Sequence, residues 1–306
     1  NSTINYYRSN PPLAGTGAQV VTTSHPYQHL IFSGTGMKSP APGATLEIKG
    51  NLTKAGTTAS FGHNEGTVLL SGTALQTYTA TAAPIIEFNN LTTNNTVGLN
   101  VKSDMGINQK MLFGSAAIIS LRDTSDVIIR SRADTTGWIA AIPVNVTINY
   151  QAHADSGRFV VERYNYAAKK WRFYSIPTIQ TQTIKAAWQE GATTSAQNPV
   201  PGYGTQIGSL YSNWAARNFD FLTPGGHDMK YWSENAAQVY IPVGRTDTII
   251  STDRGYMKYV RGDRSVIGGA ATASTLRTRG QIKRNAVSVP FTATAAKQRF
   301  SAGNPY

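Results

Sequence analysis

The chain has 306 residues, no cysteine, and 28 lysines and arginines against 16 aspartates and glutamates, which gives a formal net charge of +12. Without cysteine it cannot be a zinc ribbon, an iron–sulfur protein or a cysteine enzyme, and its length suits one large or two medium domains. No apolar stretch reaches the ~20 residues that a transmembrane helix needs, so we expect no transmembrane segment.

Composition favours strands over helices. The chain contains 28 glycines and 14 prolines and is rich in threonine and asparagine. Leucine, glutamate and lysine, which normally fill helix surfaces, are scarce. We therefore predict an all-β protein.

The first half alternates short β-branched runs with Gly and Asn turns, at residues 29–34, 45–53 and 66–72. Such runs are typical of short strands. Two phrases recur at nearly the same step: Phe32-Ser33-Gly34-Thr35 returns 38 residues later from Leu70, and Asn51-Leu52-Thr53 returns 39 residues later from Asn90. This step predicts stacked repeats and a β-solenoid-like region. The alternative is an ordinary β-sandwich whose meander resembles itself.

A boundary is predicted near Pro143, where the composition changes. Further strands are expected at 98–101, 110–113, 117–121, 127–130 and 144–150. Residues 1–150 carry 9 basic and 7 acidic side chains (+2), whereas residues 151–306 carry 19 and 9 (+10) and four of the five tryptophans. We predict a repeat-containing solenoid at 1–145 and a basic, aromatic-rich, β-sandwich-like or jelly-roll-like domain at 146–306 that continues beyond 306.

Only one helix is expected. Residues 184–190 have the composition of a helical turn or two. Residues 191–204, with two prolines and three glycines, predict a long surface loop.

Three blocks of sequence carry a family resemblance. The first is Gly66-Thr67-Val68, Gly72, Gln76, Phe88-Asn89-Asn90-Leu91-Thr92, Asn94-Asn95 and Val97-Gly98-Leu99. The second is Gly157, Val161-Glu162-Arg163-Tyr164, Lys170-Trp171-Arg172-Phe173, Ser175, Pro177, Ala187-Trp188-Gln189-Glu190-Gly191 and Pro201-Gly202-Tyr203-Gly204-Thr205. The third is Tyr256-Met257-Lys258-Tyr259-Val260-Arg261-Gly262-Asp263-Arg264, and the chain ends in Gly303-Asn304-Pro305-Tyr306. Together they resemble large secreted cell-surface proteins of Bacteroidetes-type bacteria that are exported by type IX secretion.

The resemblance implies a non-catalytic structural or adhesive segment of a secreted bacterial cell-surface protein, located outside the cell. It implies partners among other copies or other domains of the same protein, in a filament or layer, and no cofactor. The closing phrase is normally followed by more protein, so we expect the natural chain to continue past Tyr306. The rival from another class is a carbohydrate-binding or carbohydrate-active extracellular protein, a lyase or hydrolase.

Sequence motifs of known chemistry are absent: there is no Gly-x-Ser-x-Gly, His-Glu-x-x-His, Walker loop or Gly-x-Gly-x-x-Gly. His25 and His29 are close in sequence, but Pro26 prevents the helix that would place them on one face. The sequence therefore favours a protein without catalysis.

Four carboxylates are candidates for site chemistry. Asp123 and Asp126 could share a calcium ion, the one cofactor that the sequence suggests, or could form a solvated turn. Glu162 and Glu190 are the pair that a glycosidase could use, although Glu162 lies in a strand where an arginine would pair with it.

Basic side chains concentrate near the C-terminal end, where residues 261–306 hold eight of them against one acid. Arg277, Arg279, Lys283 and Arg284 are therefore candidate polyanion-binding residues, the simpler alternative being a solvated strand face. No nucleic-acid-binding motif accompanies them. An anionic surface polysaccharide is a better candidate partner than nucleic acid.

Two short motifs suggest other interactions. Arg261-Gly262-Asp263 matches the integrin tripeptide, but it follows the predicted strand at 256–260, where Arg and Asp would close a turn. Thr135 and Thr248 each follow an aspartate, as in the O-glycosylation signal that the resemblance brings with it, and are predicted to carry sugar.

Overall fold

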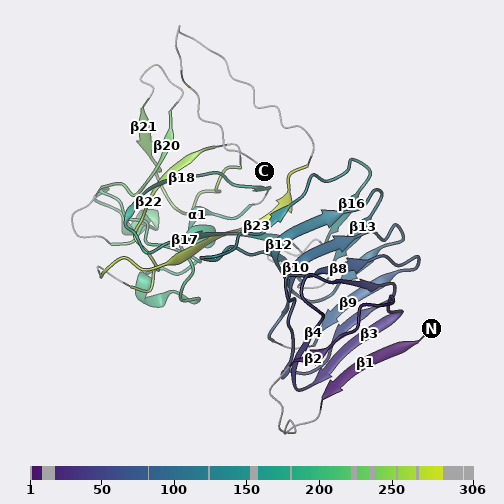
Figure 1. Cartoon of the computed structure of the whole chain (residues 1–306). Helices are drawn as coiled ribbons and strands as arrows, with labels where there is room; N and C mark the ends of the chain where they lie inside the picture. The colour runs from purple at the N-terminus through teal and green to yellow at the C-terminus, as the bar shows by residue number, and fades with distance from the viewer. Residues whose placement is uncertain are drawn as a thin grey trace. The chain divides into compact units, whose positions relative to one another are not determined.

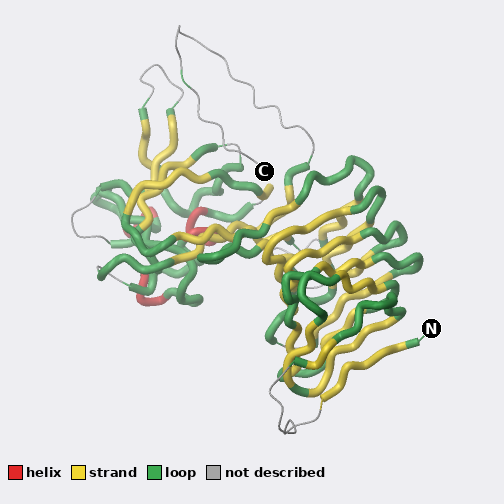
Figure 2. The backbone as a smooth tube through the Cα atoms, viewed as in Figure 1, coloured by secondary structure: helices red, strands yellow, loops and turns green. Residues whose placement is uncertain are grey.

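The structure is a computed structural model that describes residues 2–8, 18–81, 83–122, 125–151, 158–179, 181–221, 226–233, 239–252, 254–266, 269–284 and 299. It is nearly all β, with 46% strand and 4% helix, which confirms the predicted fold class. Strands joined by loops, with a few short helical turns, make up the backbone (Figure 2). None of the described helices is long and apolar enough to cross a bilayer.

The chain forms two compact units, residues 1–130 with 135–160 and residues 131–134 with 161–306. The strands of the first unit are β1 (Thr3–Arg8), β2 (Gln19–Val20), β3 (His29–Gly34), β4 (Gly36–Ser39), β5 (Thr45–Ile48), β6 (Leu52–Lys54), β7 (Ala59–Phe61), β8 (Thr67–Leu70), β9 (Gln76–Ala80), β10 (Ile86–Thr93), β11 (Leu99–Val101), β12 (Met105–Phe113), β13 (Ile118–Leu121), β14 (Val127–Ile129), β15 (Trp138–Ile139) and β16 (Thr147–Tyr150). In β17 (Phe159–Asn165) the chain passes from the first unit into the second. The first unit thus extends past the predicted boundary at 145/146.

The first unit is a β-solenoid of about five turns, as the sequence predicted (Figure 1). One parallel sheet has the order β1-β3-β6-β9-β11-β13-β16, a second runs β5-β8-β10-β12-β14 with β15 beside β12, and a third is β2-β4-β7. Successive side chains of a strand point to opposite faces, so alternate residues enter the interior. Buried apolar side chains of these strands include Leu30, Phe32, Leu46, Ile48, Leu52, Val68, Leu70, Tyr78, Phe88, Leu91, Leu99, Val101, Ile107, Met111, Ile119 and Leu121.

The repeat length differs from the predicted step of 38 to 39 residues. Leu52 lies one turn after Leu30, a step of 22 residues, and Ile119 lies one turn after Leu99, a step of 20. The recurring phrases occupy different sheets, since Phe32 is on β3 in the first sheet and Leu70 is on β8 in the second. Stacking was correctly predicted, but the phrases that suggested it are not equivalent positions.

A buried pair of amide side chains joins neighbouring turns of the solenoid. Gln76 and Asn95 are 1% and 0% exposed, and the Asn95 Nδ2 donates to the Gln76 Oε1 at 2.9 Å. Gln76 also donates to the Ile48 and Gly50 carbonyls, at 3.0 and 2.7 Å. Asn95 donates to a turn carbonyl and accepts two turn amides. Polar groups that would be costly to bury are thus satisfied by each other.

Asn95→Ala should lower the free energy of unfolding by about 2–4 kcal/mol, because several buried donors and acceptors lose their partner together. Thr96→Ala, at the exposed neighbouring position, is the control and should change it by less than about 0.5 kcal/mol. Urea unfolding followed by far-ultraviolet circular dichroism measures both. Equal effects of the two changes would contradict the role of Asn95.

The second unit is built around a four-stranded antiparallel sheet with the order β18-β22-β20-β21. The elements of this unit, the four strands of the sheet included, are β18 (Lys170–Tyr174), β19 (Thr178–Ile179), α1 (Ile184–Trp188), η1 (Ser195–Gln197), η2 (Ala215–Arg217), β20 (Met229–Trp232), β21 (Tyr240–Pro242), β22 (Tyr256–Val260) and β23 (Ser274–Ile282), which pairs with β19. The predicted helix is confirmed as α1. A sandwich of two packed sheets is not confirmed by the described residues.

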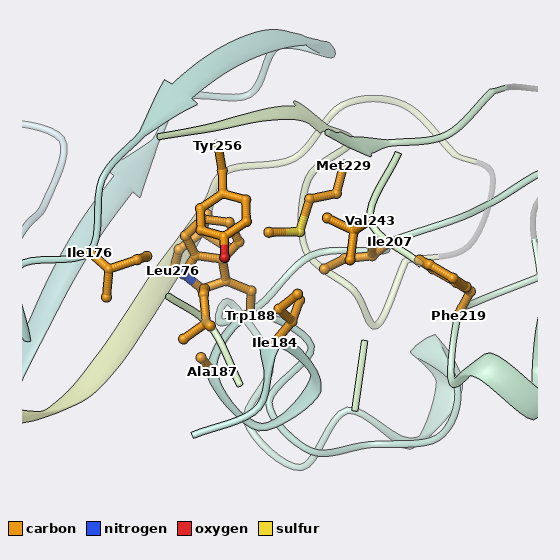
Figure 3. Close-up of a cluster of buried hydrophobic side chains, with 11 residues drawn as sticks. Ile176, Ile184, Ala187, Trp188, Ile207, Phe219, Met229, Val243, Tyr256 and Leu276 are labelled. Atoms are coloured by element: carbon orange, nitrogen blue, oxygen red, sulfur yellow. The ribbon is translucent and has the colours of Figure 1, made fainter. Parts of the chain in front are cut away.

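The core of the second unit brings α1 against the sheet (Figure 3). Trp188 of α1 lies between Tyr174 of β18 and Tyr256 of β22, with ring centroids 5.4 and 5.9 Å away. Met229 of β20 packs in the same cluster. The Thr183 side chain caps α1 by accepting the Ala186 amide at 3.1 Å. One short helix is therefore sufficient to cover the inner face of the sheet at this place.

Lys258 lies on the inner face of β22 and is fully buried. Its Nζ donates to the Gln206 carbonyl at 2.9 Å. Burial lowers the pKa of Lys258 to about 8, although the nearby Asp228 and Asp220 oppose this shift. The ordinary pKa of lysine, 10.5, applies to the unfolded chain, so unfolding takes up a proton between pH 8 and 10.5. The destabilising effect of burying this charge therefore falls, and the free energy of unfolding rises, as pH rises.

Between pH 7 and 9.5, wild type should gain about 2 kcal/mol in free energy of unfolding relative to Lys258→Met, which has no such proton to bind. Urea unfolding of both proteins at the two pH values tests this. The window stops below pH 10, because tyrosines with raised pKa, such as Tyr78 and Tyr174, act in the opposite direction above it. A constant difference between the two proteins would refute the lysine assignment.

Candidate functional site

A groove forms where the third sheet of the solenoid ends. β7 is the last described strand of that sheet, while the other two sheets continue. The next strand of the second sheet, β10, pairs with β8 only from Asn90 to Thr93, whereas its pairing with β12 begins at Ile86 and reaches Thr93. Between the edge of β7 and the first half of β10 lies a groove of about 590 Å³, which we call the solenoid groove. Its lining includes Met37, Ser60, Phe61, His63, Glu87 and Arg130.

An ion pair spans two strands in the solenoid groove. The Arg130 Nη2 lies 3.2 Å from the Glu87 Oε1, and the two side chains are 13% and 23% exposed. Gly106 of β12 lies between them. A Cβ at this position would be 3.0 Å from the Glu87 Cγ and 3.2 Å from the Arg130 Nε. The glycine therefore leaves the space in which the two side chains meet.

The wall of the solenoid groove is fixed by contacts within the first unit. Phe61 stacks on Phe32 with ring centroids 5.3 Å apart and an interplanar angle of 17°. The Ser39 Oγ donates to the Gly62 carbonyl at 2.8 Å, which ties β4 to the end of β7. The groove is thus formed before any ligand arrives.

A second surface lies on the outer side of the four-stranded sheet of the second unit. We call it the aromatic face, and it consists of Trp171, Phe173, Lys230, Trp232, Tyr240, Met257 and Tyr259. Trp171 and Phe173 are 41% and 70% exposed. Ring centroids are 5.4 Å apart for Trp171 and Tyr259, and 6.2 Å apart for Phe173 and Tyr240. Trp171 and Phe173 are thus exposed rings, each in contact with a partly buried tyrosine of the same face.

Cations accompany the aromatic face. The Lys230 Nζ lies 5.2 Å from the ring centroid of Trp171, and the Arg261 Cζ lies 4.9 Å from that of Tyr259. No residue of the face is acidic. The Trp232 Nε1 donates to the Arg299 carbonyl at 2.9 Å. The face therefore offers flat apolar rings together with positive charge.

The four basic residues predicted to bind polyanions are grouped on or beside β23. Arg277 forms an ion pair with Glu190, Nη2 to Oε2 at 2.8 Å, and its Cζ lies 3.8 Å from the Tyr203 ring centroid. Lys283 is only 8% exposed, whereas Arg279 and Arg284 are partly exposed. Much of the expected solvated face is therefore used in internal contacts. Polyanion binding by these four residues stays a prediction.

The predicted calcium pair is only half described, because Asp123 lies outside the described residues. Asp126 is 4% exposed, and its Oδ1 accepts the Arg158 amide at 3.1 Å. No group of three His, Asp or Glu side chains in the described ranges is arranged to hold a metal ion. The calcium site stays a prediction.

The two glutamates considered for glycosidase chemistry have structural contacts. Glu162 is 2% exposed, and its Oε2 accepts the Ser131 amide at 3.1 Å, while Glu190 pairs with Arg277. Of the two threonines predicted to carry sugar, Thr135 is partly buried. Thr248 is exposed, and its Oγ1 donates to the Arg245 carbonyl at 3.0 Å.

The Arg261-Gly262-Asp263 tripeptide fixes loops of the second unit. Arg261 forms a two-pronged ion pair with Asp228, both N–O distances being 2.9 Å. The Asp263 carboxylate accepts the amides of Gly202 and Ser265. Gly262 has φ +114°, and a Cβ there would be 2.6 Å from the Thr272 Oγ1. The turn that the sequence suggested is therefore present, and both charged side chains have partners inside the unit.

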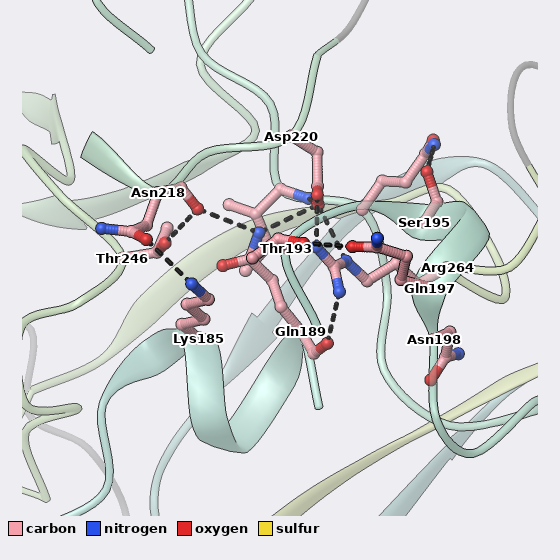
Figure 4. Close-up of polar contacts among 12 residues, drawn as sticks. Lys185, Gln189, Thr193, Ser195, Gln197, Asn198, Asn218, Asp220, Thr246 and Arg264 are labelled. Carbon is pink, nitrogen blue, oxygen red and sulfur yellow. Dashed lines mark hydrogen bonds and ion pairs between the residues drawn. The ribbon is translucent and has the colours of Figure 1, made fainter. Parts of the chain in front are cut away.

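Arg264, the next residue, forms the most buried ion pair among the described residues (Figure 4). Its side chain and that of Asp220 are 0% and 2% exposed, and two N–O contacts join them at 2.5 and 3.1 Å. Asp220 also accepts from the Gln189 side chain at 2.9 Å, and Arg264 donates to the Gln189 carbonyl at 2.8 Å. The end of β22 is thereby attached to α1.

Sequence reasoning missed the solenoid groove and the aromatic face. Glu87 and Arg130 are 43 residues apart, about two solenoid turns, and the 38-residue step concealed this relation. Gly106 inside a strand was the available signal, since an isolated strand glycine often marks a close approach. For the aromatic face the signal was alternation, because Trp171 and Phe173 are two residues apart on one strand.

Comparison with known proteins finds no matching family model, no matching curated protein and no matching solved structure. The interpretation of both surfaces therefore depends on the residues of this chain.

Arg264→Met should destabilise the second unit by about 3–5 kcal/mol, because it leaves Asp220 buried without its cation. Arg245→Met is the matched control: its partner is Asp247, and the two side chains are 47% and 35% exposed, so the loss should be much smaller than that of Arg264→Met. Thermal unfolding compares the variants. Adding Asp220→Leu to Arg264→Met should restore part of the loss, and a further equal loss would show that the pair does not act as a unit.

Proposed function

We propose that this chain is a non-catalytic adhesive segment of a secreted bacterial cell-surface protein that is exported by type IX secretion and works outside the cell without a cofactor. The aromatic face is the observation that carries this proposal. Contiguous exposed apolar patches on a protein surface are typical of contact sites. In this one, exposed Trp171 and Phe173 are accompanied by Lys230.

The partner that fits the aromatic face best is an anionic surface polysaccharide. The flat rings can stack on the apolar faces of sugar rings, while Lys230 attracts carboxylate or sulfate groups. Residues 151–306 carry a net charge of +10, which favours the approach of any polyanion. Association with other copies of the same surface protein, in a filament or layer, is the competing use of the face.

The rest of the structure suits a scaffold that carries such a surface. The solenoid repeats parallel turns whose polar side chains bond to the next turn, as Gln76 and Asn95 do. In the second unit, the Arg264–Asp220 and Arg261–Asp228 pairs hold the loops around the sheet. These charges contribute to rigidity, which lowers the entropic cost of binding at the surface they support.

The adhesive role is tested by retention of the purified chain on surfaces coated with polygalacturonate, with dextran as the neutral reference. We expect salt-sensitive retention on polygalacturonate, and at least a tenfold loss for the double variant Trp171→Ser, Phe173→Ser. Val20→Ser, at a position 71% exposed on the solenoid, is the control and should be retained like wild type.

Full retention of the double variant on polygalacturonate would contradict the assignment of adhesion to the aromatic face. Concentration-dependent self-association that the double variant abolishes, without retention on polygalacturonate, would replace the polysaccharide by a second copy of the chain. Release of new reducing ends from the polysaccharide would contradict the non-catalytic role.

A further inference from the structure

We propose that the solenoid groove is a second binding site, and that it takes an uncharged saccharide chain. This inference goes beyond the adhesive role and does not depend on the aromatic face, because every residue that it uses belongs to the first unit. At about 590 Å³ the groove has the size of ordinary small-ligand sites in proteins.

The charges in the groove favour a neutral ligand. Glu87 and Arg130 are paired at 3.2 Å, so together they contribute no net charge. An anionic ligand would have to compete with Glu87 for Arg130, and a cationic ligand with Arg130 for Glu87. A sugar hydroxyl both donates and accepts hydrogen bonds, so neighbouring hydroxyls can engage the carboxylate and the guanidinium without separating them.

The apolar wall supplies the second element of saccharide recognition. Phe61 lines the groove, and its ring contacts Phe32 and Phe88 with centroids 5.3 and 6.0 Å apart, so it is fixed in one orientation. A fixed aromatic ring can cover the apolar face of a sugar ring at little cost in side-chain entropy. Met37, which is 46% exposed, extends this apolar surface along the groove.

The groove extends over more than one strand, which suits a chain better than a single ring. It follows the side of β7, the last described strand of the third sheet, and reaches Glu87 in the first half of β10 and Arg130 beyond β14. Serine and histidine side chains, Ser60 and His63, add polar groups along it. A polypeptide strand added to β7 is the competing occupant, and the test separates it.

The test uses the full chain with methionine methyl groups labelled by ¹³C, titrated with cellohexaose, laminarihexaose and α-1,6-mannohexaose, and with hexagalacturonate for comparison. Of the five methionines in the chain, Met37 lines the groove, whereas Met229 and Met257 belong to the second unit. We expect at least one neutral hexasaccharide to shift the Met37 signal at millimolar concentration or below and to leave Met229 and Met257 unchanged.

Glu87→Gln should weaken this binding at least tenfold. The matched control is Glu47→Gln on β5 of the same sheet, whose carboxylate accepts the Ser71 hydroxyl at 2.6 Å and which should bind within twofold of wild type. If Glu87→Gln does not fold, Ser60→Trp fills the groove from β7 and should abolish the Met37 shift. The double variant of the aromatic face should bind the neutral sugar like wild type, which separates failure of this site from failure of the adhesive role.

The inference is overturned if none of the three neutral hexasaccharides shifts Met37, if Glu87→Gln binds as tightly as wild type, or if only hexagalacturonate shifts Met37. If none of the neutral hexasaccharides shifts the Met37 signal but an extended synthetic peptide does, the groove is a site of strand addition at β7.

Discussion

The structure depends on one constraint: each solenoid turn must satisfy the buried polar groups of the turn beside it. Apolar side chains such as Leu30, Leu52 and Tyr78 stack in register between turns of one sheet, but bent backbone at the corners also leaves carbonyls and amides to be satisfied. Gln76 and Asn95 do this by bonding both to each other and to turn backbone. A parallel stack of this kind tolerates changes on its outer surface more readily than changes at these interior corners.

The end of the third sheet explains where the solenoid groove lies. β4 and β7 pair in the third sheet, whereas the described strands in the turn from Leu99 to Ile119 belong to the first and second sheets. β7 is therefore left at the edge of the third sheet. Glu87 and Arg130 meet beside this edge because Gly106 gives them space. The groove is thus a consequence of the end of the third sheet together with one glycine.

The sequence was sufficient for the features that depend on local pattern. Alternating β-branched runs and Gly or Asn turns predicted an all-β chain and a solenoid, and the run at 184–190 predicted α1. The length of the solenoid repeat could not be predicted in this way. Phe32 and Leu70 are each followed by Ser-Gly-Thr, but they lie on different sheets. The role of Glu190 was equally hidden, because its partner Arg277 is 87 residues away. Pairings of this range depend on the folded topology, which no local spacing records.

These distant pairings also explain why charged motifs were poor guides to the sites. Arg261 and Asp263 belong to a short sequence with a known binding meaning, yet both are used to hold loops around β22. The surfaces that remain open are built from residues without a motif of known binding chemistry, namely alternate aromatic residues on β18 and a sheet edge beside β7. A regular repeat presents nearly the same surface at every turn. A binding site that differs from the other turns can therefore form only where the repeat changes. In this solenoid that place is the end of the third sheet, and the proposed saccharide site lies there because the fold itself makes it unlike the other turns.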